Sequence, residues 1–172
     1  GFLNREENAE TVLLARWQQP GGTFDVRVGG FVISGGNGGN DGYSGAGYAL
    51  SAEDSIVANC RFTDNFTTSQ GAGLTVGRAG VTVVNCRFEG NRAQAHWNAR
   101  GGGMYTGTVD LSVVNCVFTG NRARLGGGLY IRWTSSSGAP PVVVGCTFSK
   151  NVAGEGGGGI YSDSTNTLQP FF

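Results

Sequence analysis

The sequence predicts an all-β protein, folded as a right-handed parallel β-helix of about six turns. A motif of the form Cys-x-Phe-x-x-Asn recurs along the chain, and the residues around it alternate between apolar and polar. The four copies occupy residues 60–65, 86–91, 116–121 and 146–151, so that consecutive copies begin 26, 30 and 30 residues apart. A unit of this length cannot bury its own apolar face, whereas stacked units share a continuous core.

The alternation before each asparagine is the signal for strands. Val84, Cys86 and Phe88 share one face of the expected strand, and the residues between them share the other face. A period of two in β-branched and aromatic residues is typical of strands rather than helices. Two polar stretches, 91–100 and 122–125, lack strand character in this interpretation.

Stacking places equivalent residues of successive coils over one another, about 4.8 Å apart. We therefore expect interior columns of phenylalanine and of cysteine, and an asparagine column at one corner. Asparagine tolerates left-handed backbone there, and its amide can bond to adjacent coils. The expected columns are Phe62, Phe88, Phe118 and Phe148; Cys60, Cys86, Cys116 and Cys146; and Asn65, Asn91, Asn121 and Asn151. Glycine clusters suited to another corner occupy residues 71–73, 101–103, 126–128 and 157–159.

Length and charge limit the possible functions. A chain of 172 residues is expected to form one domain, with a lead-in at 1–29, five repeats over 30–162 and a C-terminal extension at 163–172. Twelve basic and twelve acidic residues cancel, which argues against nucleic acid or an anionic membrane surface as partner. No window approaches the ~18 apolar residues of a membrane-spanning helix.

The pairing of Phe-x-x-Asn with Gly-Gly-(Ala/Gly)-(Ile/Leu/Met) resembles the repeats of the polymorphic outer-membrane-protein type. It is also similar to the broader class of large secreted proteins with right-handed parallel β-helix repeats. The resemblance covers roughly residues 11–162. It implies an extracellular or cell-surface protein that serves as an adhesin or surface component and has no catalytic motif.

The four cysteines leave three alternatives open. Stacked parallel side chains keep their Cβ atoms near 4.8 Å, beyond the ~3.8 Å typical of disulfides, which favours a column of free interior thiols. One or two bridges are the second alternative, because a secreted chain permits them. Metal binding is disfavoured, since there is one histidine and no Cys-x-x-Cys pair.

Residues 35–41 are similar to the calcium-binding nonapeptide pattern Gly-Gly-x-Gly-x-Asp. Asn37, Asn40 and Asp41 are therefore weak calcium candidates, although the motif occurs once and supplies little negative charge. A glycine-rich loop between coils is the alternative. No metal or other cofactor is expected.

Catalytic carboxylates are not expected either. Glycoside hydrolysis requires two carboxyl groups ~5–9.5 Å apart, and acidic residues do not recur at equivalent outward positions of neighbouring repeats. We therefore expect no enzyme activity.

Surface aromatic residues are the candidates for binding. His96 and Trp97 lie in a longer loop of the second repeat, and Trp133 precedes a serine-rich stretch. Each tryptophan can stack on a sugar ring or contact a protein, or else fold back over a neighbouring coil. A tyrosine series is expected to stack outside the helix as structure: Tyr105, Tyr130 and Tyr161.

Two further features concern the outer surface. Asn65 begins the only Asn-x-Ser/Thr sequon and is a glycosylation candidate, although its place in a column would partly hide it. Outward arginines are most simply interpreted as a solvated face: Arg61, Arg87, Arg92 and Arg122.

Together these features predict a non-enzymatic structural or adhesive protein. Unpaired strands at the ends of a solenoid favour self-association, head-to-tail or lateral, into a filament or surface layer. Phe171 and Phe172 are candidate end contacts, and glycans or cell-surface proteins are candidate partners. The alternative is a carbohydrate-binding or polysaccharide-cleaving β-helix.

Overall fold

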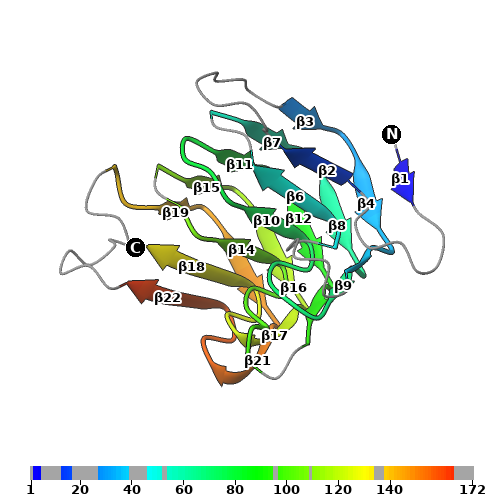
Figure 1. Ribbon diagram of the computed structural model, residues 1–172, viewed down its shortest axis with the longest axis vertical. Coiled ribbons are helices and arrows are strands. Elements are labelled where there is room, and N and C mark those ends of the chain that lie inside the picture. The colour runs from blue at the N-terminus through cyan, green and yellow to red at the C-terminus, as the bar shows by residue number, and fades with distance from the viewer. Residues whose placement is uncertain are drawn as a thin grey trace.

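A computed structural model of the chain shows short strands wound into stacked coils (Figure 1). The structure describes residues 2–4, 13–16, 27–38, 46–51, 54–94, 97–108, 110–133 and 138–164. These residues form strands, turns and no helix. Every strand pairing is parallel, which confirms the predicted all-β, parallel architecture.

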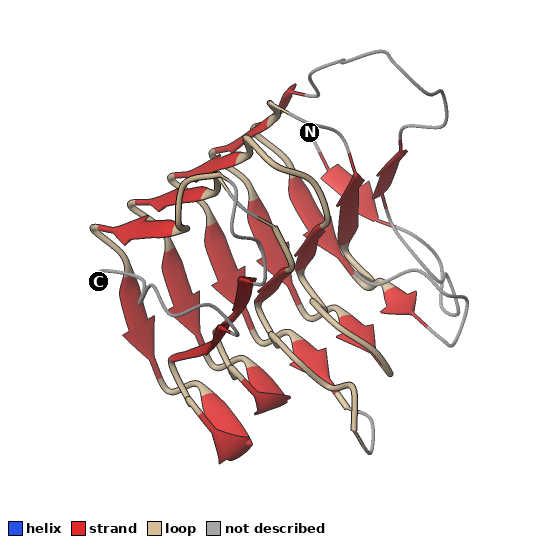
Figure 2. Ribbon diagram, turned by 60° about the vertical axis from the view of Figure 1, so that its left-hand side comes forward, coloured by secondary structure: helices blue, strands red, loops and turns tan. Residues whose placement is uncertain are grey.

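The strands form four sheets, called A to D here, that run along the solenoid (Figure 2). Sheet A consists of β1 (Phe2–Asn4), β4 (Val32–Ser34), β8 (Arg61–Thr63), β12 (Arg87–Glu89), β16 (Val117–Thr119) and β20 (Thr147–Ser149). Sheet B consists of β2 (Leu13–Arg16), β6 (Tyr48–Ser51), β10 (Leu74–Val76), β14 (Met104–Thr106), β18 (Leu129–Trp133) and β22 (Ile160–Ser164).

The other two sheets each have five strands. Sheet C consists of β3 (Arg27–Gly29), β7 (Ile56–Ala58), β11 (Thr82–Val84), β15 (Ser112–Val114) and β19 (Val142–Val144). Sheet D consists of β5 (Asn37–Gly38), β9 (Phe66–Thr67), β13 (Arg92–Ala93), β17 (Arg122–Leu125) and β21 (Val152–Gly156).

The chain visits the sheets in the order A, D, B, C in each coil. Four coils are complete, from β4 to β7, β8 to β11, β12 to β15 and β16 to β19. The described residues add one incomplete coil at each end, β1 to β3 and β20 to β22. The expected six turns therefore correspond to four complete and two partial coils.

Sheet D was not predicted. The stretches 91–100 and 122–125 were expected to lack strands, but β13 and β17 lie there. Arginine and alanine have little intrinsic preference for strands. Parallel pairing with the coils on either side imposes the extended conformation, because β13 pairs with both β9 and β17.

The interior is filled by columns of side chains in register. Phe62, Phe88 and Phe118 are fully buried, and consecutive rings of the column stack with centroids 4.6–4.8 Å apart and planes within 5°. Leu74, Met104 and Leu129 of sheet B face them from across the same core. In this shared core, equivalent side chains of successive coils therefore lie over one another, as expected.

The corners rely on left-handed backbone at a fixed place in each coil. Between sheets A and D the left-handed residues are Gly35, Asp64, Gly90, Gly120 and Lys150. Each precedes the asparagine position, so the expectation that the column asparagines themselves are left-handed is wrong. Those asparagines instead begin the next side of the coil and make hydrogen bonds with their amides.

Candidate functional site

The cysteine column is a structural element of the core. Cys60, Cys86 and Cys116 are buried, Cys146 is half-buried, and all four are free thiols. Each thiol donates to the carbonyl oxygen two residues earlier, at 3.3–3.4 Å, and is also within 3.5–3.8 Å of a carbonyl oxygen in the preceding coil. Hydrogen bonds between neighbouring thiols shift the pKa values in alternating directions along the column: they lower the pKa of Cys60 to about 7 and that of Cys116 to about 4, and they raise the pKa of Cys86 and of Cys146. The alternation arises because the thiols bond to one another inside the core, and their contacts are those of a packed structural element.

The asparagine column joins the coils at the corner between sheets A and D. The amide nitrogens of Asn65, Asn91 and Asn121 each donate to the side-chain oxygen of the next asparagine, at 2.9–3.0 Å, and to a carbonyl of the preceding coil. Asn65 is 1% exposed, and its amide nitrogen donates to Ile33 O and to Asn91 Oδ1. Its sequon is therefore inaccessible to a glycosylating enzyme in the folded chain.

The metal candidates receive little support from the part of the chain that is described. Asn37 lies exposed at the start of β5, whereas Asn40 and Asp41 lie outside the described residues. Within those residues, no group of three or more His, Cys, Asp or Glu side chains could hold a metal ion.

The aromatic candidates separate into one exposed and one buried residue. Trp97 is 77% exposed, and its carbonyl oxygen accepts a hydrogen bond from Arg124 Nη1 at 2.8 Å. Trp133 is only 2% exposed, because it continues the inward face of β18 after Leu129 and Ile131. It packs in the interior and offers no ring face to a ligand. His96, Phe171 and Phe172 lie outside the described residues.

The tyrosine series stacks along sheet B. Ring centroids are 5.5 Å apart between Tyr105 and Tyr130 and 5.4 Å apart between Tyr130 and Tyr161. The Tyr130 hydroxyl donates to Asp163 Oδ2 at 2.7 Å, and the Arg100 guanidinium lies over its ring. Burial and this hydrogen bond raise the pKa of Tyr130. The series is a packed structural column.

On sheet A, two outward arginines share one carboxylate. Arg61 and Arg87 are in register on β8 and β12, and Glu89 lies between their guanidinium groups. Arg61 Nε donates to one carboxylate oxygen at 2.6 Å, and Arg87 Nε donates to the other at 2.9 Å. One carboxylate thus bridges two cations that would otherwise repel each other.

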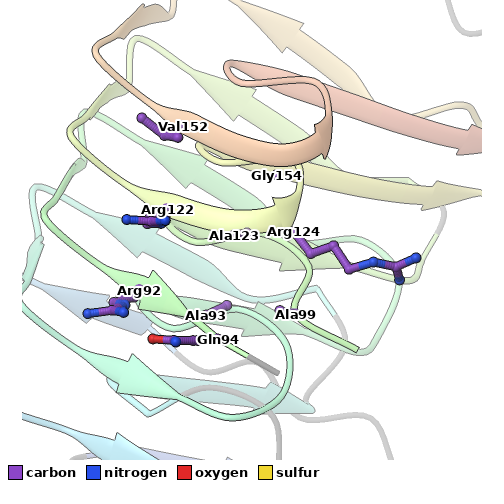
Figure 3. A pocket seen from close by; sticks show the side chains of 9 residues that line it. All are labelled: Arg92, Ala93, Gln94, Ala99, Arg122, Ala123, Arg124, Val152 and Gly154. Carbon is purple, nitrogen blue, oxygen red and sulfur yellow. The ribbon is translucent and has the colours of Figure 1, made fainter. Parts of the chain in front are cut away.

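Sheet D carries a second arginine pair, beside a groove of about 180 Å³. Figure 3 shows Arg92 and Arg122 pointing to one side, one above the other, while Arg124 extends to the opposite side. Small residues line the groove between them, and Gln94 lies beside Arg92. The sequence interpretation treated these arginines as a solvated face and missed the groove, although both directly follow a column asparagine.

Residues 29–169 match the family described as the right-handed β-helix region. The chain belongs to the right-handed β-helix family. No curated protein and no solved structure matches the chain.

Membership of the right-handed β-helix family agrees with the coils seen in the structure and gives them their handedness. The match begins at the end of β3 and runs through all the complete coils. The described residues contain no helix that could cross a membrane. Within the described residues, the surface features of this β-helix are the columns of outward-facing side chains, the groove on sheet D and the two end coils.

Proposed function

We propose that this β-helix is a non-enzymatic structural or adhesive module of an extracellular or cell-surface protein, and that it associates with itself coil on coil. The repeats resemble those of the polymorphic outer-membrane-protein type, which supports a surface role. The observation that carries the proposal of self-association is the half-exposed interior of the last coil.

In the last described coil, β20 to β22, no described residue stacks on the interior columns beyond Phe148, Asn151 and Ala153. Phe148, Asn151 and Ala153 are only half-buried, whereas their counterparts one coil earlier are at most 5% exposed. Asn151 donates to Phe118 O, but its backbone N–H and second amide hydrogen have no acceptor within the described part of the chain. Another coil would cover these apolar groups and accept these hydrogen bonds.

A second copy is the occupant that matches this end, because it supplies parallel coils of the same spacing. Such a contact joins two different ends of the molecule, so it does not close on itself and gives filaments.

The acidic residues support a role without catalysis. Glu89 is held by Arg61 and Arg87, Glu155 by Arg124, and Asp163 by Tyr130. Asp110 accepts the backbone N–H of Ala139 at 2.6 Å. Each of these carboxylates stabilises the fold by a direct contact.

Carbohydrate binding without cleavage is the second candidate. The exposed Trp97 favours it, because an aromatic ring that faces solvent can stack on a sugar. Trp133 no longer contributes to this candidate.

Ala153→Lys tests the end-to-end contact. Ala153 pairs with the buried Ala123, so a coil stacked on it would leave no room for a long side chain. In the monomer the new lysine can extend into solvent at the half-exposed end. The control is Val152→Lys, which adds the same charge on the same strand but on the outward side.

We expect wild type and Val152→Lys to grow in mass with concentration in light scattering and to form filaments in electron micrographs, while Ala153→Lys stays monomeric. Alkylation of Cys146 should also slow as wild-type concentration rises, because the contact would cover the half-buried thiol. A wild-type chain that remains monomeric at millimolar concentration, with a constant alkylation rate, would rule out the self-association.

A further inference from the structure

The sulfur atoms of the cysteine column occupy the same place in each coil. Every one of the four Sγ atoms lies 3.3–3.4 Å from the carbonyl oxygen two residues before it. The phenylalanine two residues after each cysteine measures how far apart equivalent groups are, and consecutive rings lie 4.6–4.8 Å apart. Neighbouring sulfurs of the column are therefore separated by about one coil, ~4.8 Å.

This arrangement does not suit the usual structural roles of cysteine pairs and clusters. A disulfide requires sulfurs ~2.05 Å apart and Cβ atoms ~3.8 Å apart, whereas parallel side chains keep their Cβ atoms about one coil apart. A tetrahedral zinc site requires ligands on four sides of one point. Within the described ranges, no group of three or more His, Cys, Asp or Glu side chains could hold a metal ion. A straight row of thiols instead offers a metal ion two ligands, one on each side.

The spacing of the column fits a metal ion that lies in a line between two sulfurs. A bond between a metal ion and a thiolate is about 2.3 Å long, so two such bonds end to end separate the sulfurs by about 4.6 Å. Copper(I) favours soft thiolate ligands and accepts two of them in a line. The stacking distance of the coils is therefore close to the sulfur–sulfur distance of a two-coordinate copper(I) site.

One pair of neighbouring thiols in the column is accessible from solvent. Cys60 is 2% exposed, and Cys86 and Cys116 are fully buried, whereas Cys146 is half-buried in the last described coil. A cation can reach Cys146 and its neighbour Cys116 while the chain stays folded. The other two pairs are enclosed by the core on both sides.

Both sulfurs of the accessible pair accept a backbone hydrogen bond. The N–H of Cys86 donates to Cys116 Sγ, and the N–H of Cys116 donates to Cys146 Sγ, each at 3.4 Å. Such donors favour the thiolate over the thiol, and they offset part of the negative charge that two thiolates bring to one cation. Because the donors belong to the backbone of adjacent coils, they also hold the two sulfurs in the column.

We propose that Cys116 and Cys146 bind one copper(I) ion in a line between their sulfurs. Each thiol releases its proton to solvent as its sulfur–copper bond forms, so the bound ion and its two thiolates carry one net negative charge. Copper remains in the +1 state, and the step requires no oxidant or reductant. Two protons are released, so the apparent affinity rises with pH. This site goes beyond the proposed structural role and does not depend on it.

The test titrates copper(I) into the fully reduced chain without oxygen, in competition with a chromophoric copper(I) chelator. Silver(I), a cation of the same class that does not change its oxidation state, repeats the titration. X-ray absorption of the loaded chain counts the sulfur atoms around the ion and measures their distance. The main variant is Cys146→Ser, and its matched control is Cys60→Ser, which removes a thiol two coils away from Cys116.

We expect one copper(I) ion per chain, with two sulfur neighbours at about 2.3 Å. Cys146→Ser should bind copper(I) at least about 100-fold more weakly, because it removes one of the two ligands. Cys60→Ser should change the affinity by less than about threefold, because it lies far from the ion. One equivalent of copper(I) should slow alkylation of Cys146 by iodoacetamide at least about tenfold, because the coordinated thiolate is no longer a free nucleophile.

The absorption and alkylation measurements use the wild-type chain, and circular dichroism shows whether each variant keeps its β-structure. Three results would each overturn the inference: no copper(I) bound in competition with the chelator, equal loss of affinity in the two variants, or three or more sulfur neighbours around the ion. Light scattering of the metal-free chain tests self-association separately. Copper(I) binding by a strictly monomeric chain would remove only the self-association, and filaments that bind no copper(I) would remove only this site.

Discussion

Asn91 donates two hydrogen bonds to one atom of the next coil, the side-chain oxygen of Asn121. Its backbone N–H and its amide nitrogen each lie 3.0 Å from that oxygen. The other amide hydrogen of Asn91 goes back to Phe62 O at 2.9 Å. One asparagine side chain thus connects three consecutive coils at a corner that is closed to water.

Replacement of Asn121 by alanine should lower the free energy of unfolding by about 3 kcal/mol, because it removes the shared acceptor of the buried Asn91 N–H and Asn91 amide nitrogen. Asn121→Asp keeps the shape and an acceptor but loses the donor to Phe88 O, and we expect it to cost at least about 2 kcal/mol. Urea unfolding followed by circular dichroism measures both changes. Gln94→Ala, on the exposed surface, is the control. A loss below 0.5 kcal/mol for Asn121→Ala would contradict the role of the column.

The phenylalanine column predicts a gradient along the solenoid. Phe88→Ala removes a ring that stacks between two others in the fully buried core, and should cost about 4 kcal/mol. Phe148→Ala acts in the half-buried last coil and should cost roughly half as much. The comparison uses urea unfolding at concentrations where the chain is monomeric. Equal losses at the two positions would show that the last coil is as well covered as the central coils.

The repeat spacing brings equivalent phenylalanines and cysteines together, so their columns could be predicted. Alternation correctly assigns Phe88 and Cys86 to the inward face, but it also assigned Val84 there, whereas Val83 is the buried residue. The expected single strand is in fact two, β11 and β12, with left-handed Asn85 between them. Trp133 carried the same signal, since Leu129, Ile131 and Trp133 alternate along β18. Interpreting it from the serine-rich loop that follows placed it outside, although the alternation places it in the core.

The strands of sheet D and the groove beside them could not be predicted from local preferences. Arg92 and Arg122 have no strand pattern of their own, because β13 has two residues and depends on its neighbours for pairing. The alignment of repeats contained the useful signal, since each arginine directly follows a column asparagine. The charge of the groove depends on which acidic side chains come close to its arginines in the folded chain. The sequence does not show that Glu89 pairs with Arg61 and Glu155 with Arg124, whereas the structure does.

Lys150 provides a test of backbone strain. It occupies the left-handed corner position with φ of 55°, where Gly90 and Gly120 stand in the two preceding coils. Lysine is disfavoured in this conformation by about 1 kcal/mol or more, so Lys150→Gly should raise the free energy of unfolding by about 0.5–1 kcal/mol. Gly120→Ala is the reciprocal variant. The nearest atom to an added Cβ would be Gly90 N at 3.9 Å, so any loss of stability would come from the backbone conformation alone. Thermal unfolding measures both, and destabilisation by Lys150→Gly would contradict the strain.

Glu89 makes the stability of sheet A depend on pH. Burial opposes ionisation of Glu89, but hydrogen bonds from Arg87 and Arg61 outweigh burial, so the pKa of Glu89 is lowered in the folded chain. A carboxylate whose folded pKa lies below its unfolded pKa stabilises fully above the unfolded value of about 4.3. That contribution is lost as the pH falls from there through the folded pKa.

Glu89→Gln should therefore destabilise the chain at pH 7 and have progressively less effect as the pH falls below about 4. Because the arginines are exposed, the loss at pH 7 should be modest, about 0.5–1 kcal/mol. Urea midpoints for wild type and variant between pH 3 and pH 7 give the difference directly. The control is Arg92→Gln, which removes a charge from the arginine pair that has no acidic partner and should not lower stability at any of these pH values. A Glu89→Gln effect that stays constant from pH 7 to pH 3 would mean that Glu89 acts by packing, and the two sheets would then not differ in how their arginines are balanced.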